Sequence, residues 1–230
     1  MKTDFLVIGS GIAGLTYLIK IAEKFPNKKV LVVAKNQESN TQFAQGGVAI
    51  VQNDSDSFKK HYNDTLLAGD GLCDEEIVEM VIKEGPNCLA EMVDWGVEFD
   101  LNSGGYFDLG KEGGHSENRV VHYKDITGAE ISRAMHLRLK KLKNVTFLTN
   151  HFVVDLISDH HLQIEKAKNK RTCYGAYILN QKNSEVIKVV SKITVLASGG
   201  IGQVYGHTTN PKVATGDGVA MAYRLSLIHI

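Results

Sequence analysis

The sequence of 230 residues has no net charge, because 26 lysines and arginines balance 26 aspartates and glutamates. The chain therefore lacks the excess of positive charge that is typical of proteins that bind nucleic acids or anionic membranes. No apolar run approaches the length of a membrane span, and the first run, residues 5–8, ends in a glycine turn unlike a signal peptide. We therefore expect neither nucleic acid nor a membrane as a partner.

Cysteine is scarce as well. Cys73, Cys88 and Cys173 are isolated from one another, and none forms a CxxC pair. An odd number of separate thiols fits a reducing compartment better than a disulfide framework or a zinc site. The cytoplasm is therefore the expected location, and no metal site is predicted. The sequence also contains no P-loop and no Ser/His/Asp set, and His61 is predicted to be a surface or core residue.

A glycine-rich turn near the N-terminus carries the first positive signal. The apolar residues 5–8 have the length and composition of a buried strand and continue directly into residues 9–14, Gly-Ser-Gly-Ile-Ala-Gly. In such a turn Gly9 allows a tight bend, Gly11 leaves room for a phosphate, and Gly14 lets the helix lie close to the strand. The helix N-terminus offers free N–H groups to an anion. The turn predicts a dinucleotide site.

The surrounding pattern supports a strand–helix–strand unit. Residues 15–25 have apolar positions at helical spacing, and residues 29–34 form a second buried strand. The acidic residue that usually binds the ribose about 20 residues beyond the glycines is missing. Lys35 stands at the end of the second strand, where it fits either a 2′-phosphate or a solvated position. The alternative to a nucleotide site is a βαβ unit without a ligand.

The rest of the chain predicts more helices and strands. Helices are expected at residues 56–68, 74–95 and 127–142. Asp74 is expected to cap the second of these, Pro86 to kink or divide it, and Thr127 with Glu130 to form a capping box on the third. Strands expected at residues 145–148, 152–157, 174–179 and 186–190 alternate with polar turns, and 193–197 is a further buried strand.

These elements predict the α/β class. We expect a Rossmann-like domain with a parallel central sheet and an inserted antiparallel β layer. The domain is predicted to cover residues 1–224.

Four glycine-bearing segments carry a family resemblance. Residues 9–14, 44–47, 196–200 and 215–218 occur in the order typical of the succinate dehydrogenase/fumarate reductase flavoprotein superfamily, which the chain resembles. The resemblance implies an FAD-binding domain. Residues 42–49, 111–116 and 125–131 further resemble the L-aspartate oxidase family, the flavoenzymes of bacterial NAD biosynthesis. The likeness covers the chain from Asp4 to about Arg224.

The resemblance also implies which residues hold the cofactor. Asn40 stands where membrane succinate dehydrogenases carry a histidine bonded to FAD, and an asparagine has no ring nitrogen to form that bond. The FAD is therefore expected to be held noncovalently. The expected cofactor-binding residues are Gly9, Ser10, Gly11, Ile12, Ala13, Gly14, Lys35, Asn40, Thr41, Gln42, Phe43, Ala44, Gln45, Gly46, Gly47, Gly199, Gly200 and Asp217.

Two residues in a polar loop are the candidates for substrate binding. Succinate has two carboxylates and needs only positive partners, whereas aspartate adds an ammonium that a nearby carboxylate attracts. Glu112 matches the position of such a carboxylate in the family; by itself it is a solvated charge beside Lys111. His115 either contacts flavin or substrate or braces the loop. His122 is expected to be structural.

The resemblance implies oxidation of L-aspartate to iminoaspartate with oxygen or fumarate as electron acceptor, and quinolinate synthase as a functional partner. The alternatives are a soluble fumarate reductase or succinate dehydrogenase, and a catalytically silent nucleotide-binding module. The family's catalytic arginine falls beyond the last residue, and residues 225–230 depart from the family pattern and look extraneous. We expect this chain alone to lack oxidase activity and to bind FAD weakly.

Overall fold

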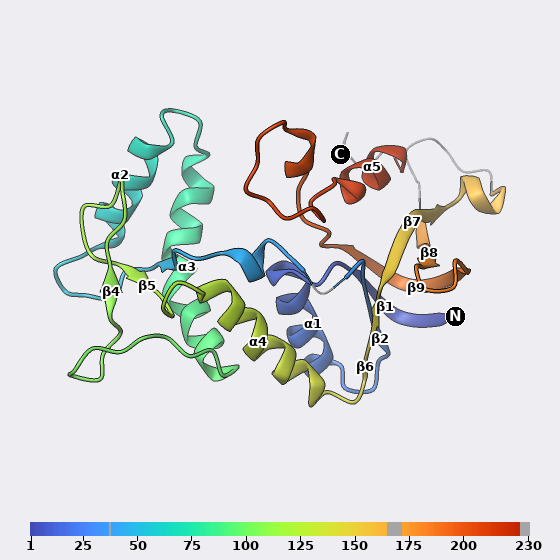
Figure 1. Ribbon diagram of the computed structural model, residues 1–230, viewed down its shortest axis with the longest axis horizontal. Helices are drawn as coiled ribbons and strands as arrows, with labels where there is room; N and C mark the ends of the chain where they lie inside the picture. The colour runs from blue at the N-terminus through green and yellow to red at the C-terminus, as the bar shows by residue number, and fades with distance from the viewer. Residues whose placement is uncertain (37, 165–171, 226–230) are drawn as a thin grey trace. The chain divides into compact units, whose positions relative to one another are not determined.

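The computed structural model describes residues 1–36, 38–164 and 172–225 (Figure 1). The chain divides into two compact units: one comprises Met1–Thr41 and the chain from Met135 onward, and the other comprises Gln42–Ala134. The domain predicted over residues 1–224 thus contains two such units. Of the six residues predicted to be extraneous, Leu225 is buried, and residues 226–230 lie outside the described residues.

A six-stranded sheet forms the centre of the first unit, in the order β6-β2-β1-β9-β8-β7. β6, β2, β1 and β9 are parallel neighbours, and β9, β8 and β7 are antiparallel neighbours. The predicted α/β class with a parallel central sheet is confirmed. The strands are β1 (Lys2–Ile8), β2 (Val30–Ala34), β6 (Val145–Thr149), β7 (His151–Ser158), β8 (Cys173–Asn180) and β9 (Val186–Leu196).

The antiparallel strands differ in detail from the sequence prediction. They extend the central sheet, because β9 is one long strand that pairs with β1 on one side and with β8 on the other. The two strands predicted at 186–190 and 193–197 are its two ends. β6, which the pattern grouped with the antiparallel strands, pairs in parallel with β2. A short strand of alternating residues does not reveal the direction of its neighbour.

Helices cover both faces of this sheet (Figure 1). Alternation along β1 sends Leu6 and Ile8 to one face, where they share a buried cluster with Met221 and Leu225 at the end of α5 (Asp217–Arg224). α1 (Ile12–Lys24) buries an apolar stripe that includes Leu15 and contacts β1 and β2. The strands β1 and β2 therefore pack against α1, and the opposite face of β1 packs against α5.

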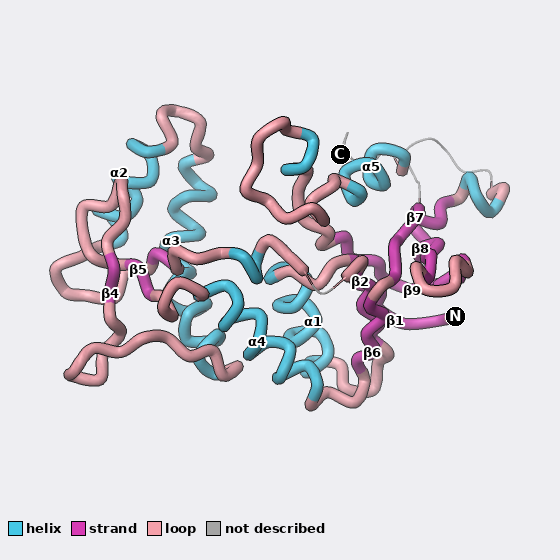
Figure 2. The backbone as a smooth tube through the Cα atoms, viewed as in Figure 1, coloured by secondary structure: helices cyan, strands magenta, loops and turns pink. Residues whose placement is uncertain are grey.

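The second unit contains two helices and a small sheet, and Figure 2 shows long loops between its short strands. The helices are α2 (Phe58–Ala68) and α3 (Glu75–Asp94), and α4 (Thr127–Lys140) begins in this unit. The antiparallel sheet has the order β3-β5-β4, from Val48–Ala49, Val120–Val121 and Leu109–Gly110.

Single 3₁₀ turns occur at Thr41–Phe43, His160–Leu162 and Gly202–Val204.

The ends of the helices test three local predictions. Asp74 caps α3 as predicted, because its side chain accepts a hydrogen bond from the Ile77 N–H. Of the two alternatives predicted at Pro86, the division is wrong, since α3 continues through it, and the kink stays a prediction. Burial of Ile82 and Leu89 on either side of Pro86 keeps the helix intact.

The capping box predicted at the start of α4 is also wrong. The Thr127 hydroxyl accepts from the Tyr123 N–H and donates to the Gln45 carbonyl, and Glu130 accepts from the Glu98 N–H and from Arg133. Tertiary partners have therefore taken both side chains.

Among the described residues, no helix is both long and apolar enough to cross a membrane.

Candidate functional site

The glycine turn between β1 and α1 has the geometry that its sequence predicts. Gly9 has a φ of +110°, and a Cβ there would lie 2.2 Å from the Ala197 carbonyl oxygen. A Cβ at Gly14 would lie 2.2 Å from the Gly9 carbonyl oxygen. Both positions therefore exclude any larger residue. At Gly11 a Cβ would make only ordinary contacts, with Thr41 Oγ1 at 3.6 Å and Ser39 Cβ at 3.9 Å, so this position is less crowded.

A pocket of about 560 Å³ opens at the carboxyl ends of β1, β2 and β9. This is the edge at which open α/β sheets bind their ligands, and the volume falls within the ~300–1,000 Å³ of small-molecule sites. It receives residues from five separate segments of the sequence, within residues 8–13, 33–41, 151–153, 196–200 and 213–222. Of the predicted cofactor-binding residues, Gly9, Ser10, Gly11, Ile12, Ala13, Lys35, Asn40, Thr41, Gly199, Gly200 and Asp217 line it.

Lys35 and Asp217 form an ion pair in the wall of this pocket. The Lys35 ammonium donates to Asp217 Oδ2 at 2.5 Å, to Thr215 Oγ1 at 2.7 Å and to the Val213 carbonyl at 2.7 Å. Lys35 is thus not the solvated strand-end charge that one interpretation of the sequence expected. It joins the end of β2 to the start of α5.

Two further side chains bind the pocket's loops together. The Thr41 hydroxyl accepts a hydrogen bond of 2.9 Å from the N–H of Ile12, the first residue of α1. The Asn40 amide donates to Asn210 Oδ1 at 3.0 Å. Asn40 and Thr41, which lie beside the glycine turn, are therefore both fixed by polar contacts.

The other predicted site residues belong to the second unit. Glu112 is exposed, and its carboxylate lies so close to Gly46 that a Cβ there would be 2.6 Å from Glu112 Oε1. Gly47 is equally tight, because a Cβ on it would lie 2.5 Å from the Val121 carbonyl. The structure thus brings Glu112 to the segment 42–47 that the resemblance places beside the flavin. The backbone of Ala44 is held by the Gly128 N–H at 2.9 Å.

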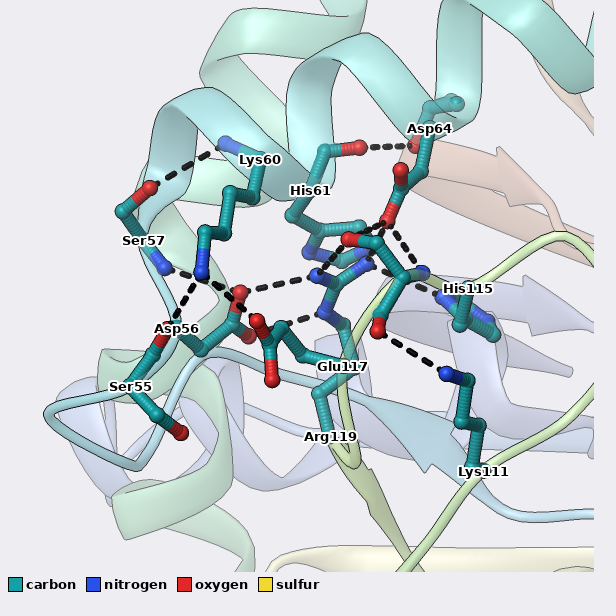
Figure 3. Close-up of polar contacts among 12 residues, drawn as sticks. Ser55, Asp56, Ser57, Lys60, His61, Asp64, Lys111, His115, Glu117 and Arg119 are labelled. Carbon is teal, nitrogen blue, oxygen red and sulfur yellow. Dashed lines mark hydrogen bonds and ion pairs between the residues drawn. The ribbon is translucent and has the colours of Figure 1, made fainter.

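A buried arginine organises the loop that carries Glu112 and His115 (Figure 3). The Arg119 side chain is fully buried, and its guanidinium forms two hydrogen bonds of 2.8 Å with the two oxygens of Asp56. A third bond, of 2.5 Å, goes to Asp64 Oδ2, which also accepts from the N–H and the hydroxyl of Ser116 at 2.8 Å each. Asp64 therefore connects α2 to both the arginine and the loop.

These contacts shift the pKa values of both carboxyl groups. Burial opposes ionisation of Asp56, but hydrogen bonds from Arg119 and the Ser57 N–H outweigh it and lower the pKa of Asp56. Burial likewise opposes ionisation of Asp64, and hydrogen bonds from Ser116 and Arg119 still hold its pKa far below the usual value. Both side chains are therefore charged at neutral pH.

Two histidines lie against this cluster. His115 Nδ1 is 3.1 Å from Arg119 Nη1, and the rings of His115 and His61 lie 5.8 Å apart. Burial lowers the pKa of His61, with further lowering from Arg119 and His115. His61 is therefore neutral at physiological pH. The contacts of His115 agree with the interpretation that it braces the loop.

The sequence did not single out Arg119, Asp56 or Asp64. One signal was available: Arg119 directly precedes the apolar pair of β5, and a charge that enters a buried strand needs a partner. Nothing in the pattern indicates that the partners come from the region of α2. His122, predicted to be structural, pairs with Asp100 at 3.2 Å.

Comparison with known proteins identifies the family. Residues 4–229 match the family described as the FAD binding domain. The chain belongs to this family. The pocket of the first unit fits such a cofactor, because its glycine turn has no room for a side chain at Gly9 or Gly14.

Two relatives sharpen the likeness. The chloroplastic L-aspartate oxidase of Oryza sativa subsp. japonica is 43% identical over 225 residues, which are 98% of this chain and 34% of the relative. L-aspartate oxidase 1 of Ralstonia nicotianae is 38% identical over 97% of this chain and 42% of its own length. The resemblance to L-aspartate oxidases is confirmed, and the chain spans about a third to two fifths of the relatives' length.

A solved structure shows the same fold. Quinol fumarate reductase from E. coli superposes with a TM-score of 0.86 and 29% identity, over 97% of this chain and 37% of that chain. The same fold therefore occurs in relatives named L-aspartate oxidase and in a fumarate reductase. Fold alone does not separate these two activities.

Proposed function

We propose that the chain is the FAD-holding part of an L-aspartate oxidase that converts L-aspartate to iminoaspartate, with oxygen or fumarate as electron acceptor. The observation that carries the proposal is the pocket at the carboxyl ends of β1, β2 and β9, in a chain 43% identical to the rice enzyme. Bound FAD would supply the chemistry by accepting the hydride of the substrate. The residues of this chain hold the cofactor and set the charges beside it.

In this proposal the pocket residues hold FAD without a covalent bond. Gly9–Gly14 would meet the pyrophosphate, and Asn40, with no nucleophilic ring nitrogen, supports noncovalent attachment. Lys35 and Asp217 are already paired with each other, so we assign them to the wall that keeps the pocket open. The predicted role of residues 42–47 beside the flavin remains a prediction.

Glu112 is proposed to select aspartate. Its exposed carboxylate lies against Gly46, and as an anion it cannot pair with a carboxylate of the substrate. A substrate ammonium would gain a charge-assisted hydrogen bond from Glu112, whereas a second carboxylate would be repelled. The same segment would therefore favour aspartate over succinate.

A soluble fumarate reductase is the second candidate, because the solved structure with a TM-score of 0.86 is a fumarate reductase. A catalytically silent nucleotide-binding module is the third. Anaerobic reduction of bound flavin separates the three candidates, in a protein of the relatives' full length. We expect aspartate to bleach the flavin and succinate not to. Bleaching by succinate would favour the second candidate, and absence of bound flavin the third.

The cellular context completes the proposal. Three free cysteines support a reducing compartment, and we propose the cytoplasm, although the rice relative is named chloroplastic. Iminoaspartate would be passed on to quinolinate synthase in NAD biosynthesis. We further propose that the 230-residue chain alone lacks oxidase activity and binds FAD weakly. Aspartate-dependent peroxide formation by the purified chain would contradict this.

A further inference from the structure

The guanidinium of Arg119 has an acceptor for every one of its five N–H donors (Figure 3). Asp56 takes two, Asp64 one, the Ser116 hydroxyl one at 3.4 Å, and His115 Nδ1 one at 3.1 Å. An arginine donates and never accepts, so the nitrogen that faces it must carry a lone pair. The contact therefore assigns the state of the His115 ring.

With Nδ1 as acceptor, the proton of the neutral ring is on Nε2. The alternative tautomer would point an N–H at a buried cation and leave one guanidinium N–H without an acceptor, which costs free energy in a buried site. A doubly protonated ring would place a second positive charge against Arg119. The charged and titratable groups around His115 are His61, Asp64 and Lys60 on α2, Asp56 before it, Lys111, Glu112 and Glu117 in its own loop, and Arg119.

The loop itself places His115 beside Glu112. The backbone N–H of His115 donates to the backbone carbonyl of Glu112 at 3.2 Å, which closes a turn between the two residues. Ser116, the next residue, is held by Asp64, and its carbonyl accepts from the Lys111 ammonium at 2.9 Å. The carboxylate of Glu112 and the half-buried imidazole of His115 are thus carried by one short, anchored turn.

We infer that Arg119 is a positioning residue that fixes His115 as an Nε2–H donor, and that this donor binds a carboxylate of the substrate whose ammonium Glu112 receives. The second half of the inference rests on the proposed function. An acceptor for ammonium and a donor for carboxylate, three residues apart, match an amino-acid dicarboxylate. They match succinate poorly, because succinate offers no partner for Glu112.

The tautomer is measurable on the 230-residue chain itself. In protein labelled with ¹⁵N-histidine, two-bond ¹⁵N–¹H correlations distinguish a protonated from an unprotonated ring nitrogen, and His115→Gln assigns the signals by their loss. At pH 7.5 we expect an unprotonated Nδ1 and a protonated Nε2. An Nδ1–H tautomer or a doubly protonated ring would overturn the inference, whatever the protein oxidises.

A matched pair of variants tests the substrate contact in a protein of the relatives' length. His115→Gln retains a donor near the Nε2 position, and His115→Asn retains only an acceptor near the Nδ1 position. We expect the KM for aspartate to stay within about threefold in the glutamine variant and to rise about tenfold in the asparagine variant, or ~1.4 kcal/mol. The opposite order would show that His115 only braces Arg119, and the substrate contact would be wrong.

The two failures are distinguishable. If the unchanged protein does not oxidise aspartate, the proposed function fails and the substrate contact falls with it, while the ¹⁵N spectrum still decides the role of Arg119. If aspartate is oxidised and both variants behave alike, the proposed function stands and the role of His115 is overturned.

Discussion

In the first unit, the glycine turn beside the pocket depends on backbone geometry, because a Cβ at Gly9 or at Gly14 would lie 2.2 Å from a carbonyl oxygen. In the second unit, the loop with Glu112 and His115 depends on one buried side chain, Arg119, and on carboxylates from another segment. Backbone geometry therefore shapes the glycine turn of the pocket, whereas charge pairing holds the cluster of Arg119, Asp56 and Asp64 together.

Removal of the arginine should have the largest effect. Arg119→Met leaves Asp56 and Asp64 without their cation, and breaking a buried pair costs about 3–5 kcal/mol. We expect this loss in the free energy of unfolding, measured by denaturant titration. Arg138→Met is the matched control, because Arg138 pairs with Glu23 at the surface and should lose about 0–1 kcal/mol. Equal losses of unfolding free energy in both variants would show that the buried Arg119 pairs stabilise the protein no more than a surface pair does.

A substitution in the glycine turn should weaken cofactor binding. In Gly9→Ala the new methyl would meet the Ala197 carbonyl at 2.2 Å, at a positive φ that alanine rarely adopts. We expect FAD binding to weaken by at least about tenfold, or ~1.4 kcal/mol, in a fluorescence titration. Gly206→Ala, which has no neighbour within 4 Å, should bind as the unchanged chain does. Equal affinity in the two variants would contradict the assigned cradle.

Loss of charge at Glu112 should change specificity. Glu112→Gln keeps the shape and removes the partner of the substrate ammonium, which is worth about 1.5–3 kcal/mol for a charged hydrogen bond. In a protein of the relatives' full length, we expect kcat/KM for aspartate to fall by roughly 10- to 100-fold. Reduction of fumarate, which has no ammonium, is the control and should change little. A parallel fall in both activities would remove the ammonium role.

Acid should weaken the second unit through His61. Burial lowers the pKa of His61, so the unfolded chain binds this proton more readily than the folded one. The stability that His61 contributes is present above its unfolded pKa of about 6.5 and is lost as the pH falls below it. Denaturation midpoints at pH 7.5 and 5.5 should therefore differ. His61→Gln should reduce the difference, and an unchanged difference would assign it to other groups.

The same contrast explains what the sequence could predict. Gly9, Gly14 and the cap at Asp74 act through backbone geometry within a few residues, which the local pattern records. The Arg119 cluster joins residues more than 50 positions apart, and no periodicity reports it. The capping box at Thr127 failed for the same reason: its side chains have distant partners. The central claim concerns the pocket, where local pattern and tertiary structure agree.

Titration of the purified 230-residue chain with FAD tests that claim most directly. Isothermal calorimetry should show weak, saturable binding of one FAD per chain, undiminished by excess NAD and reduced in Gly9→Ala. The flavin should be released intact on denaturation, as noncovalent attachment requires. No binding of FAD, or displacement of FAD by NAD, would contradict the account.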